Sequence, residues 1–501
     1  MNDRTSIPEF FTGRDIFITG GSGFLGKALI EKLLRSCSNL NRIYVLIRGK
    51  KGKTAEARLK EMFNSEFFNK VREKNDLLIN KVTAIDGDVM LPGLGISASN
   101  VQMLKNVSIV IHSAASVKFD DPLKEAILMN ARGTLETLKL AEGFPNIKAF
   151  VHISTTYSNP DKHVVEEELY PAKVDWRTAI KLAENYSTEM LNIFNLKYSE
   201  FQPNTYTFTK GLAEQIANDY KQKLPVFIYR PSIVVSSIEE PVPGWIDNFN
   251  GPVGMFVASG IGILRTAHGD PDVCLDYMPV DIAVKGLIVA VYKKCLENHS
   301  PEELIVYNCS TATVRPVSTG DVIEMAKVLI KDNPMEQTFW VPGGGITRYK
   351  YWYYLRFMTL HVLFAILADT ILRISNNKPF FLKLQRKIYA ANNALHYFNI
   401  TQWSFQNDKF YEMDKFIMPC DKKEFAFEHY TNIDIHEFFK NALVGAKYWL
   451  LKMPLKSSKW AKIKFRILTV VNFSIQLTIG IIILRMGVLY VYRNYFTTNS
   501  T

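Results

Sequence analysis

A tyrosine and a lysine, Tyr206 and Lys210, stand four residues apart in the stretch Tyr-Thr-Phe-Thr-Lys. On a helix this spacing places both side chains on one face, with the ammonium beside the phenol. A free phenol has a pKa of about 10, and a neighbouring positive charge favours its ionised form, which eases proton transfer near neutral pH. The pair is therefore a candidate proton donor. The alternative is a solvated pair on a helix surface.

A glycine-rich turn near the start of the chain favours the chemical interpretation. Residues 15–19 have the apolar composition of a strand, and residues 27–35 have the spacing of an amphipathic helix. Gly20, Gly23 and Gly26 lie on the turn between them, where missing side chains let the backbone approach a pyrophosphate at a helix N-terminus. The pattern predicts a dinucleotide site, and the alternative is an ordinary strand-to-helix turn.

The end of the next strand indicates which dinucleotide is bound. Residues 42–48 form an apolar run that ends in Arg48, and Lys50 and Lys51 follow. An acid at this position would accept a hydrogen bond from the ribose 2′-hydroxyl of NAD, whereas cations match the 2′-phosphate of NADP. The sequence therefore favours NADPH, with a solvated basic loop as the alternative.

Two further apolar runs, at 82–88 and 107–115, predict the third and fourth strands. Asp88 ends the first, where the adenine would lie. Ala114 belongs to a group of small residues at the end of the second, which leave room for the cofactor. Asn130 then opens the next helix.

A fifth apolar run, at 150–156, ends in three hydroxyl side chains, Ser154, Thr155 and Thr156. Such residues often cap the following helix. However, an open parallel sheet holds its ligand at the carboxyl ends of its strands. We therefore expect Thr155 to hydrogen-bond a substrate carbonyl, with its two neighbours as alternatives.

Several longer motifs occur together with these features, at residues 16–27, 204–210, 229–234, 243–248 and 278–281. In this order and combination they resemble the extended short-chain dehydrogenase/reductases. The closer resemblance is to the alcohol-forming fatty acyl-CoA reductases of the insect type. It covers nearly the whole chain, with no departure at the catalytic positions.

The resemblance implies a Rossmann-type, doubly wound parallel α/β sheet, with a C-terminal α-helical domain and a C-terminal membrane segment. The implied reaction reduces a long-chain fatty acyl-CoA to a primary alcohol with two NADPH and releases CoA. The implied catalytic residues are Tyr206, Lys210 and Thr155. The residues expected to bind the cofactor are Gly20, Gly23, Phe24, Leu25, Gly26, Arg48, Asp88, Ala114, Asn130 and Lys210.

Two alternatives to this function stay open. A membrane-bound sterol dehydrogenase of the same branch would share Tyr206 and Lys210, but would need NAD and would lack the motifs at 229–234 and 243–248. A catalytically idle nucleotide-binding membrane scaffold would have no need of the intact Thr-Tyr-Lys set.

Composition sets further limits. The five cysteines are scattered, with no Cys-x-x-Cys pair, which predicts a reducing compartment and neither a disulfide framework nor a metal site. The formal net charge of +11 favours an acidic partner. No motif for binding nucleic acid accompanies it, so membrane lipid is the expected partner. The oligomeric state is not fixed by the sequence, and a homodimer is one option.

The domain organisation is predicted as a reductase domain over residues 12–345 and a helical domain over 346–455. A long insertion, with a helical stretch at 178–194, precedes Tyr206; it is either a lid over the substrate mouth or a surface decoration. Within the helical domain, the apolar segment 357–372 is either a membrane-contacting helix or a buried core helix.

Residues 467–484 are uncharged and nearly long enough to cross a bilayer, so they are the predicted transmembrane anchor, with a surface-lying hairpin as the alternative. Lysines and an arginine crowd the N-terminal side of this segment, from Lys447 to Arg466, whereas Arg485 and Arg493 are the only cations after it. The positive-inside rule then places the catalytic domain in the cytosol. The expected location is the membrane of the endoplasmic reticulum or the peroxisome.

Overall fold

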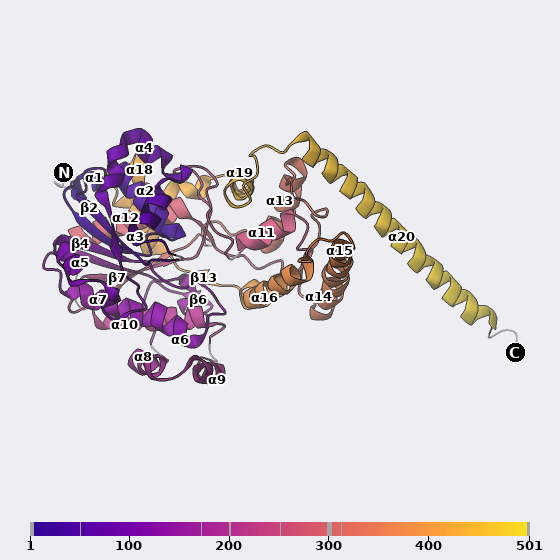
Figure 1. The fold of residues 1–501 in the computed structure, drawn as a ribbon, viewed down its shortest axis with the longest axis horizontal. Coiled ribbons are helices and arrows are strands. Elements are labelled where there is room, and N and C mark those ends of the chain that lie inside the picture. The colour runs from indigo at the N-terminus through magenta and orange to yellow at the C-terminus, as the bar shows by residue number, and fades with distance from the viewer. Residues whose placement is uncertain are drawn as a thin grey trace.

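The computed structural model describes residues 5–50, 52–171, 173–199, 202–250, 252–297, 303–311 and 313–497. A seven-stranded parallel sheet forms its centre (Figure 1). The strands lie in the order β3-β2-β1-β4-β5-β7-β11, and each is parallel to its neighbours. Their bounds are β1 (Asp15–Thr19), β2 (Arg42–Ile47), β3 (Val82–Asp86), β4 (Val107–His112), β5 (Ala149–Ile153), β7 (Val226–Pro231) and β11 (Ile305–Cys309). The strand order reverses between β1 and β4, where such sheets bind ligands. The predicted doubly wound fold is confirmed.

Helices cover both faces of the sheet because its strands are apolar on both sides. In β1, Ile16 and Ile18 face one core and Phe17 faces the other, as the alternation of side chains along a strand requires. The first face is covered by α2 (Phe24–Ser36), α3 (Ala55–Phe63), α4 (Asn69–Asn75) and α12 (Val280–Leu296). The second is covered by α6 (Leu123–Ala126), the π-helix η5 (Ile127–Arg132), α7 (Gly133–Glu142) and α10 (Thr205–Asp219).

The insertion before α10 forms two helices, α8 (Trp176–Asn185) and α9 (Thr188–Tyr198). They pack against α6, η5 and α10 on the outside of the second helix layer (Figure 1). No described residue of either helix lines the large apolar cavity described below. Of the two interpretations of this insertion, the structure favours a surface decoration over a lid.

A second group of elements lies beyond the carboxyl edge of the sheet (Figure 1). Short parallel pairs form between β8 (Ile233–Val235) and β10 (Tyr277–Pro279), and between β9 (Thr266–His268) and β12 (Gly345–Thr347). The helices of this group are α11 (Pro252–Gly260), α13 (Thr319–Asp332), α14 (Lys350–Phe357), the π-helix η7 (Met358–Val362), α15 (Leu363–Ile374) and α16 (Phe381–Ile400).

After α16 the chain returns to the sheet. The strand β13 (Ser404–Phe405) pairs with β6 (Val164–Val165), and α17 (Asp408–Lys415), α18 (Lys422–Phe425) and α19 (Ile435–Gly445) follow. Phe410, Met413 and Phe425 are buried in the same core as α2 and α12. The sequence predicted a separate helical module over 346–455. Apolar side chains of its second half cover α12 in the core of the nucleotide domain, and the division of the chain at residue 345 stays a prediction.

The last helix, α20 (Lys459–Thr497), projects from the body with its apolar side chains exposed (Figure 1). Two helical stretches, 350–374 and 459–492, are long and apolar enough to cross a membrane. The second contains the segment predicted as the anchor. Asn472, a polar residue within it, is bonded to the body, since the Trp340 indole Nε1 donates to its Oδ1 at 2.9 Å.

Lys447 does not belong to the exposed basic cluster that precedes α20. Its side chain is fully buried, and its ammonium donates to the Asn333 Oδ1 at 2.9 Å and to the Ser457 hydroxyl at 3.1 Å. Only the cations from Lys452 onward can therefore act as the positive flank of α20 that predicts a cytosolic catalytic domain.

Candidate active site

The turn between β1 and α2 has a backbone that only glycine allows. Gly20 has a φ of +74°, and a Cβ on it would lie 2.6 Å from the Ala114 nitrogen. A Cβ on Gly26 would lie 2.4 Å from the Gly20 oxygen. The turn is thus pressed against both β4 and the first turn of α2, as a phosphate-binding turn requires.

Gly23 is the N-cap of α2 and provides no side-chain hydrogen bond to the helix. The backbone N–H groups of Phe24, Leu25 and Gly26 lie in the first turn, where an α-helix leaves its donors without an intrahelical partner. These donors and the helix dipole can hold a pyrophosphate. Phe24 and Leu25 would therefore act through their backbone, since their side chains pack elsewhere in the core.

A polar cavity of about 250 Å³ opens beside this turn, over the point where the strand order reverses. Its lining combines residues that were predicted with others that were not: Gly20, Ser22, Gly23, Leu46, Ile47, Arg48, Lys50, Arg58, Gly87, Asp88, Val89, Ser113, Ala114, Ala115 and Met129. Five of the ten predicted cofactor residues thus line one cavity just beyond the ends of the central strands, whereas Phe24, Leu25, Gly26, Asn130 and Lys210 are not in its lining.

Arg48 and Asp88 form an ion pair at the rim of this cavity, with 3.3 Å between Nη1 and Oδ2. Arg58, from α3, also reaches the cavity and donates to the Arg48 carbonyl at 2.6 Å. Arg58 and Ser22, which also line the cavity, were not predicted from the sequence. Arg58 could have been found from its position, because it lies one turn inside the helix that follows the basic loop and faces the end of β2.

Tyr206 lies in the first turn of α10, which Asn204 caps by accepting a hydrogen bond from the Thr207 N–H at 2.9 Å. One turn later, Lys210 is buried, and its ammonium donates to the Ile153 carbonyl at the end of β5, at 2.6 Å. The Thr155 side chain, two residues beyond that strand, lies near enough to the Tyr206 hydroxyl to lower its pKa. The three predicted catalytic residues therefore meet at the carboxyl edge of β5.

Burial dominates the electrostatics of this group. It raises the pKa of Tyr206 to about 12, against the opposite effect of the Thr155 side chain. Burial also lowers the pKa of Lys210 to about 8, and the nearby Glu214 carboxylate partly opposes this shift. The sequence predicted that Lys210 would favour the phenolate of Tyr206. In the structure Lys210 is not among the causes that shift the pKa of Tyr206, and desolvation raises it, so the tyrosine is held protonated, as a proton donor must be.

The three hydroxyls after β5 have different surroundings. Ser154 donates to the Glu214 carboxylate at 2.6 Å, and Thr156 is fully buried. Of the three, Thr155 is the one whose side chain lowers the pKa of Tyr206. This arrangement favours Thr155 over its neighbours as the substrate-facing hydroxyl.

Asn130 lies on the π-helix η5 and positions the loop beside the nucleotide cavity. Its amide oxygen accepts from the Ser116 N–H at 2.8 Å, and its amide nitrogen donates to the Ser116 carbonyl at 3.1 Å and the Thr209 hydroxyl at 2.9 Å. Its side chain does not line the cavity. The contacts of Asn130 therefore link β4 to α10, and direct contact with the cofactor remains a prediction.

The motif at 243–248 supports the nucleotide turn from behind. The Trp245 ring stacks on Phe67 with 3.7 Å between centroids and lies 4.9 Å from the Phe24 ring. Asp247 accepts from the Lys27 ammonium at 2.8 Å. The motif thus fixes the start of α2.

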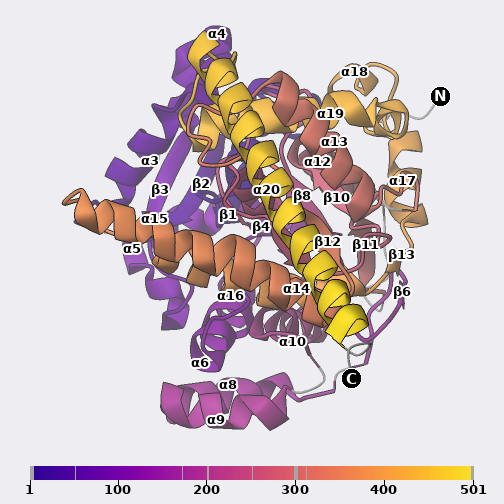
Figure 2. The ribbon, with the colours of Figure 1, turned by 90° about the vertical axis from the view of Figure 1, so that its right-hand side faces the viewer.

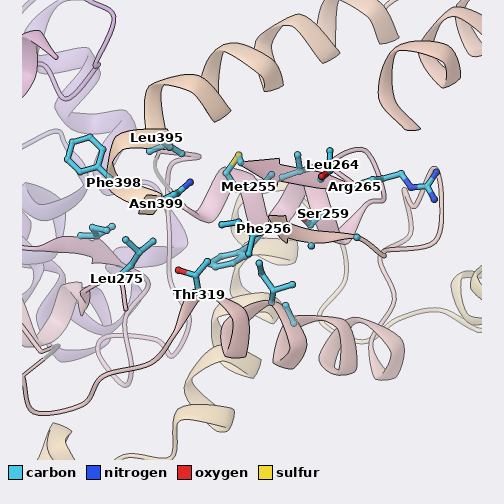
Figure 3. A pocket seen from close by; sticks show the side chains of 18 of the residues that line it. Met255, Phe256, Ser259, Leu264, Arg265, Leu275, Thr319, Leu395, Phe398 and Asn399 are labelled. Carbon is cyan, nitrogen blue, oxygen red and sulfur yellow. The ribbon is translucent and has the colours of Figure 1, made fainter. Parts of the chain in front are cut away.

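An apolar cavity of about 190 Å³ extends away from Tyr206, between the sheet edge and the second group of helices. Figure 3 shows its side chains, with Phe398 and Arg265 at opposite ends of the view. Tyr206 and Phe119 line it near the catalytic group, and their rings lie 5.9 Å apart. The rest of the wall includes Met255, Phe256, Leu264, Leu275, Ile323, Ile330 and Leu395. An extended hydrocarbon chain fits such a lining.

Comparisons with known proteins agree with this geometry. A family model of NAD-binding domains described as "Male sterility protein" matches residues 18–287, and a second model of the same description, Sterile, matches residues 360–453. The chain is 37% identical to the fatty acyl-CoA reductase wat of Drosophila melanogaster, over 90% of this chain and 87% of that one. It is 32% identical to fatty acyl-CoA reductase 1 of Homo sapiens, over 99% of both chains.

Among solved structures, the reductase domain of a nonribosomal peptide synthetase from Mycobacterium tuberculosis has a TM-score of 0.58 at 16% identity, over 89% of this chain and 93% of that one. The terminal R domain of the myxalamid pathway has a TM-score of 0.57 at 16% identity, with the same coverage. Both show the extended Rossmann-type fold. The two family models and the curated relatives show that this chain belongs to the fatty acyl-CoA reductase family.

Proposed function

We propose that this protein reduces long-chain fatty acyl-CoA to primary fatty alcohol, with NADPH as the reductant. The observation that carries the proposal is the apolar cavity lined by Tyr206, in a chain that also has a nucleotide cavity at the ends of its central strands. A long acyl chain in this cavity would bring its thioester carbonyl to Tyr206 and Thr155. A sterol dehydrogenase is the less favoured alternative, because the basic rim of the nucleotide cavity suits a 2′-phosphate.

The residues of the nucleotide cavity fit the cofactor. Gly20 and Gly26 let the turn pack against neighbouring backbone that a Cβ would strike, and the first turn of α2 offers N–H donors to the pyrophosphate. Arg48, Lys50 and Arg58 line the cavity and would hold the 2′-phosphate of the cofactor. When bound, the reduced cofactor supplies the hydride for each of two reductions, so one thioester consumes two NADPH and two protons and yields one alcohol and one CoA.

The side chains of the site stabilise the negatively charged oxygen and donate the proton. In the first reduction, Thr155 and Tyr206 hydrogen-bond the oxyanion that forms from the thioester carbonyl. This oxyanion is that of a hemithioacetal. When it collapses, the carbonyl re-forms, the carbon–sulfur bond breaks and the CoA thiolate leaves. In the second reduction, Tyr206 gives its proton to the alkoxide of the reduced aldehyde. Lys210, one turn further along α10, holds a positive charge near the phenolate that remains.

A product assay tests the proposal. The purified full-length protein is incubated with a panel of acyl-CoAs and NADPH, while cofactor oxidation, free thiol and lipid products are measured. We expect two NADPH oxidised and one thiol released for each alcohol formed. Accumulation of aldehyde at one NADPH per thiol would contradict alcohol formation, and oxidation of a sterol with NAD would support the alternative enzyme.

The cofactor preference gives a separate prediction at Arg48. Replacing Arg48 with Asp exchanges an attraction for the 2′-phosphate for a repulsion. The KM for NADPH should rise roughly tenfold or more, the factor that corresponds to about 1.4 kcal/mol, while the KM for NADH changes little. Arg42→Asp is the matched control, since Arg42 is an exposed arginine at the opposite end of the same strand. Equal effects on both cofactors would exclude Arg48 as the phosphate ligand.

Membrane attachment through α20 gives another prediction. Ending the chain after Lys464 removes the predicted span at 467–484 but keeps the docked segment before it. In that segment the Ser457 N–H donates to Asn333 and the Ser458 N–H donates to Glu336, and neither serine belongs to the catalytic group. This shortened protein should keep its activity on detergent-dispersed acyl-CoA and should move partly to the soluble fraction of cells.

The orientation is tested on the full-length protein. With the catalytic domain in the cytosol, protease added outside intact microsomes or peroxisomes should digest it. A catalytic domain that survives until the membranes are opened would contradict this orientation and the argument from the cations between Lys452 and Arg466.

A further inference from the structure

The helical stretch from α14 through η7 to α15 has an inverted distribution of polarity. Its buried side includes two polar side chains, His361 and Asp369, at 0% and 4% exposure. Its exposed side is almost entirely apolar, with the exposed residues Leu355, Met358, Leu363, Ile366, Leu367, Ile371 and Ile374. Water is an unfavourable neighbour for so large a continuous apolar face.

The polar side chains fix this stretch to the body along its length. The His361 imidazole Nε2 accepts from the backbone N–H groups of Arg265 and Thr266, at 3.1 and 3.2 Å. The Asp369 carboxylate accepts from the N–H groups of residues 380, 381 and 382 at the start of α16. The stretch is long enough to cross a membrane. However, a spanning orientation would carry these bonds and β9 into the hydrocarbon, or would break them.

The positive charge around these helices indicates what binds their exposed apolar face. Between residues 346 and 400 the sequence contains one acidic residue, the buried Asp369, and eight lysines and arginines, of which Arg348 is paired with Asp270 and Asp272. Cations around an apolar helix face match an anionic lipid surface. A symmetric contact with a second copy of the chain would instead bring two such basic rims together. Tyr349, Tyr351 and Trp352, exposed at the start of the stretch, are of the type enriched at membrane interfaces.

We propose that α14, η7 and α15 lie flat in the membrane–water interface, as a second membrane contact that does not span the bilayer. Figure 2 shows these helices across the face of the body from which α20 also extends. The stretch packs against the wall of the apolar cavity, because Arg265 and Thr266 line the cavity and their backbone N–H groups bond His361. If the proposed function holds, the membrane contact brings the cavity for the acyl chain close to the lipid surface.

Depth measurements along the stretch test the orientation independently of enzyme activity. Single cysteines at Leu355, Leu363, Leu367 and Ile374 are labelled with an environment-sensitive fluorophore in the full-length protein, in a background where Cys274, Cys295 and Cys420 are replaced by serine. The protein is reconstituted into vesicles of phosphatidylcholine and phosphatidylserine that contain spin labels near the headgroup or near the chain end. A label at the exposed Lys139, on α7, is the control outside the membrane.

We expect all four labels to lie at a common depth of about 5–10 Å, with stronger quenching by the shallow spin label and none at Lys139. A spanning helix would instead give depths that differ by about 28 Å between Leu355 and Ile374, which would overturn the proposal. Absence of quenching at all four positions would also overturn it. Cross-linking between labelled copies would then assign the face to a second copy of the chain. Loss of enzyme activity with unchanged depths would count against the proposed function alone.

Discussion

Tyr206→Phe should reduce alcohol formation by ~100-fold or more, the range expected for the loss of a general acid. The substitution keeps the ring and its contact with Phe119, 5.9 Å away, and removes only the hydroxyl. The nucleotide cavity does not include Tyr206 among its lining residues. NADPH binding, measured by fluorescence titration, should therefore stay near the wild-type value while turnover falls.

Tyr220→Phe is the matched control. Tyr220 ends the same helix and is almost fully buried, but it does not line the apolar cavity. This variant should keep wild-type turnover. If Tyr206→Phe formed alcohol at a near-normal rate, the proton would have to come from another group and the mechanism would be wrong.

The main features of the site could be predicted because each depends on local sequence. Gly20 and Gly26 follow a strand and open a helix, and Tyr206 and Lys210 share one helix face. The resemblance to fatty acyl-CoA reductases and the doubly wound fold are both confirmed. The roles of the individual site residues remain predictions.

Features that depend on tertiary packing were not predictable in this way. The raised pKa of Tyr206 comes from burial, which no spacing in the sequence reveals. Lys447 looks like one more surface lysine before α20, yet it is buried against Asn333. Likewise, the apolar residues from 404 onward correctly predicted helices. Their pattern did not show that Phe410 and Met413 pack in the core of the nucleotide domain.

The ion pair between Arg230 and Glu214 is the clearest feature that sequence reasoning missed. Arg230 belongs to the motif at 229–234, but nothing in the motif indicates its partner. Glu214 lies one helical turn after Lys210, so Tyr206, Lys210 and Glu214 follow each other at intervals of four on α10. From the sequence alone, that repeat could have shown the Glu214 carboxylate to face the site.

Arg230→Met should destabilise the protein by about 3–5 kcal/mol, the cost of leaving one member of a buried ion pair without its partner. Both side chains are essentially inaccessible, at 0% and 1% exposure, and two parallel hydrogen bonds of 2.8 Å join them. Arg230 also donates to the Glu168 carbonyl at 2.9 Å, and Ser154 donates to the Glu214 carboxylate at 2.6 Å. The pair therefore holds β7, α10 and the end of β5 in the arrangement that the catalytic residues need.

A double-mutant cycle with Glu214→Gln measures the coupling. The double variant should be more stable than the sum of the two single losses predicts, because it leaves no unpaired charge. Thermal unfolding monitored by circular dichroism gives the comparison. Glu61→Gln breaks the exposed pair with Lys53 and should leave the unfolding midpoint unchanged. If Arg230→Met shifted the midpoint no more than Glu61→Gln does, the buried pair would not be what holds the strand ends and α10 together.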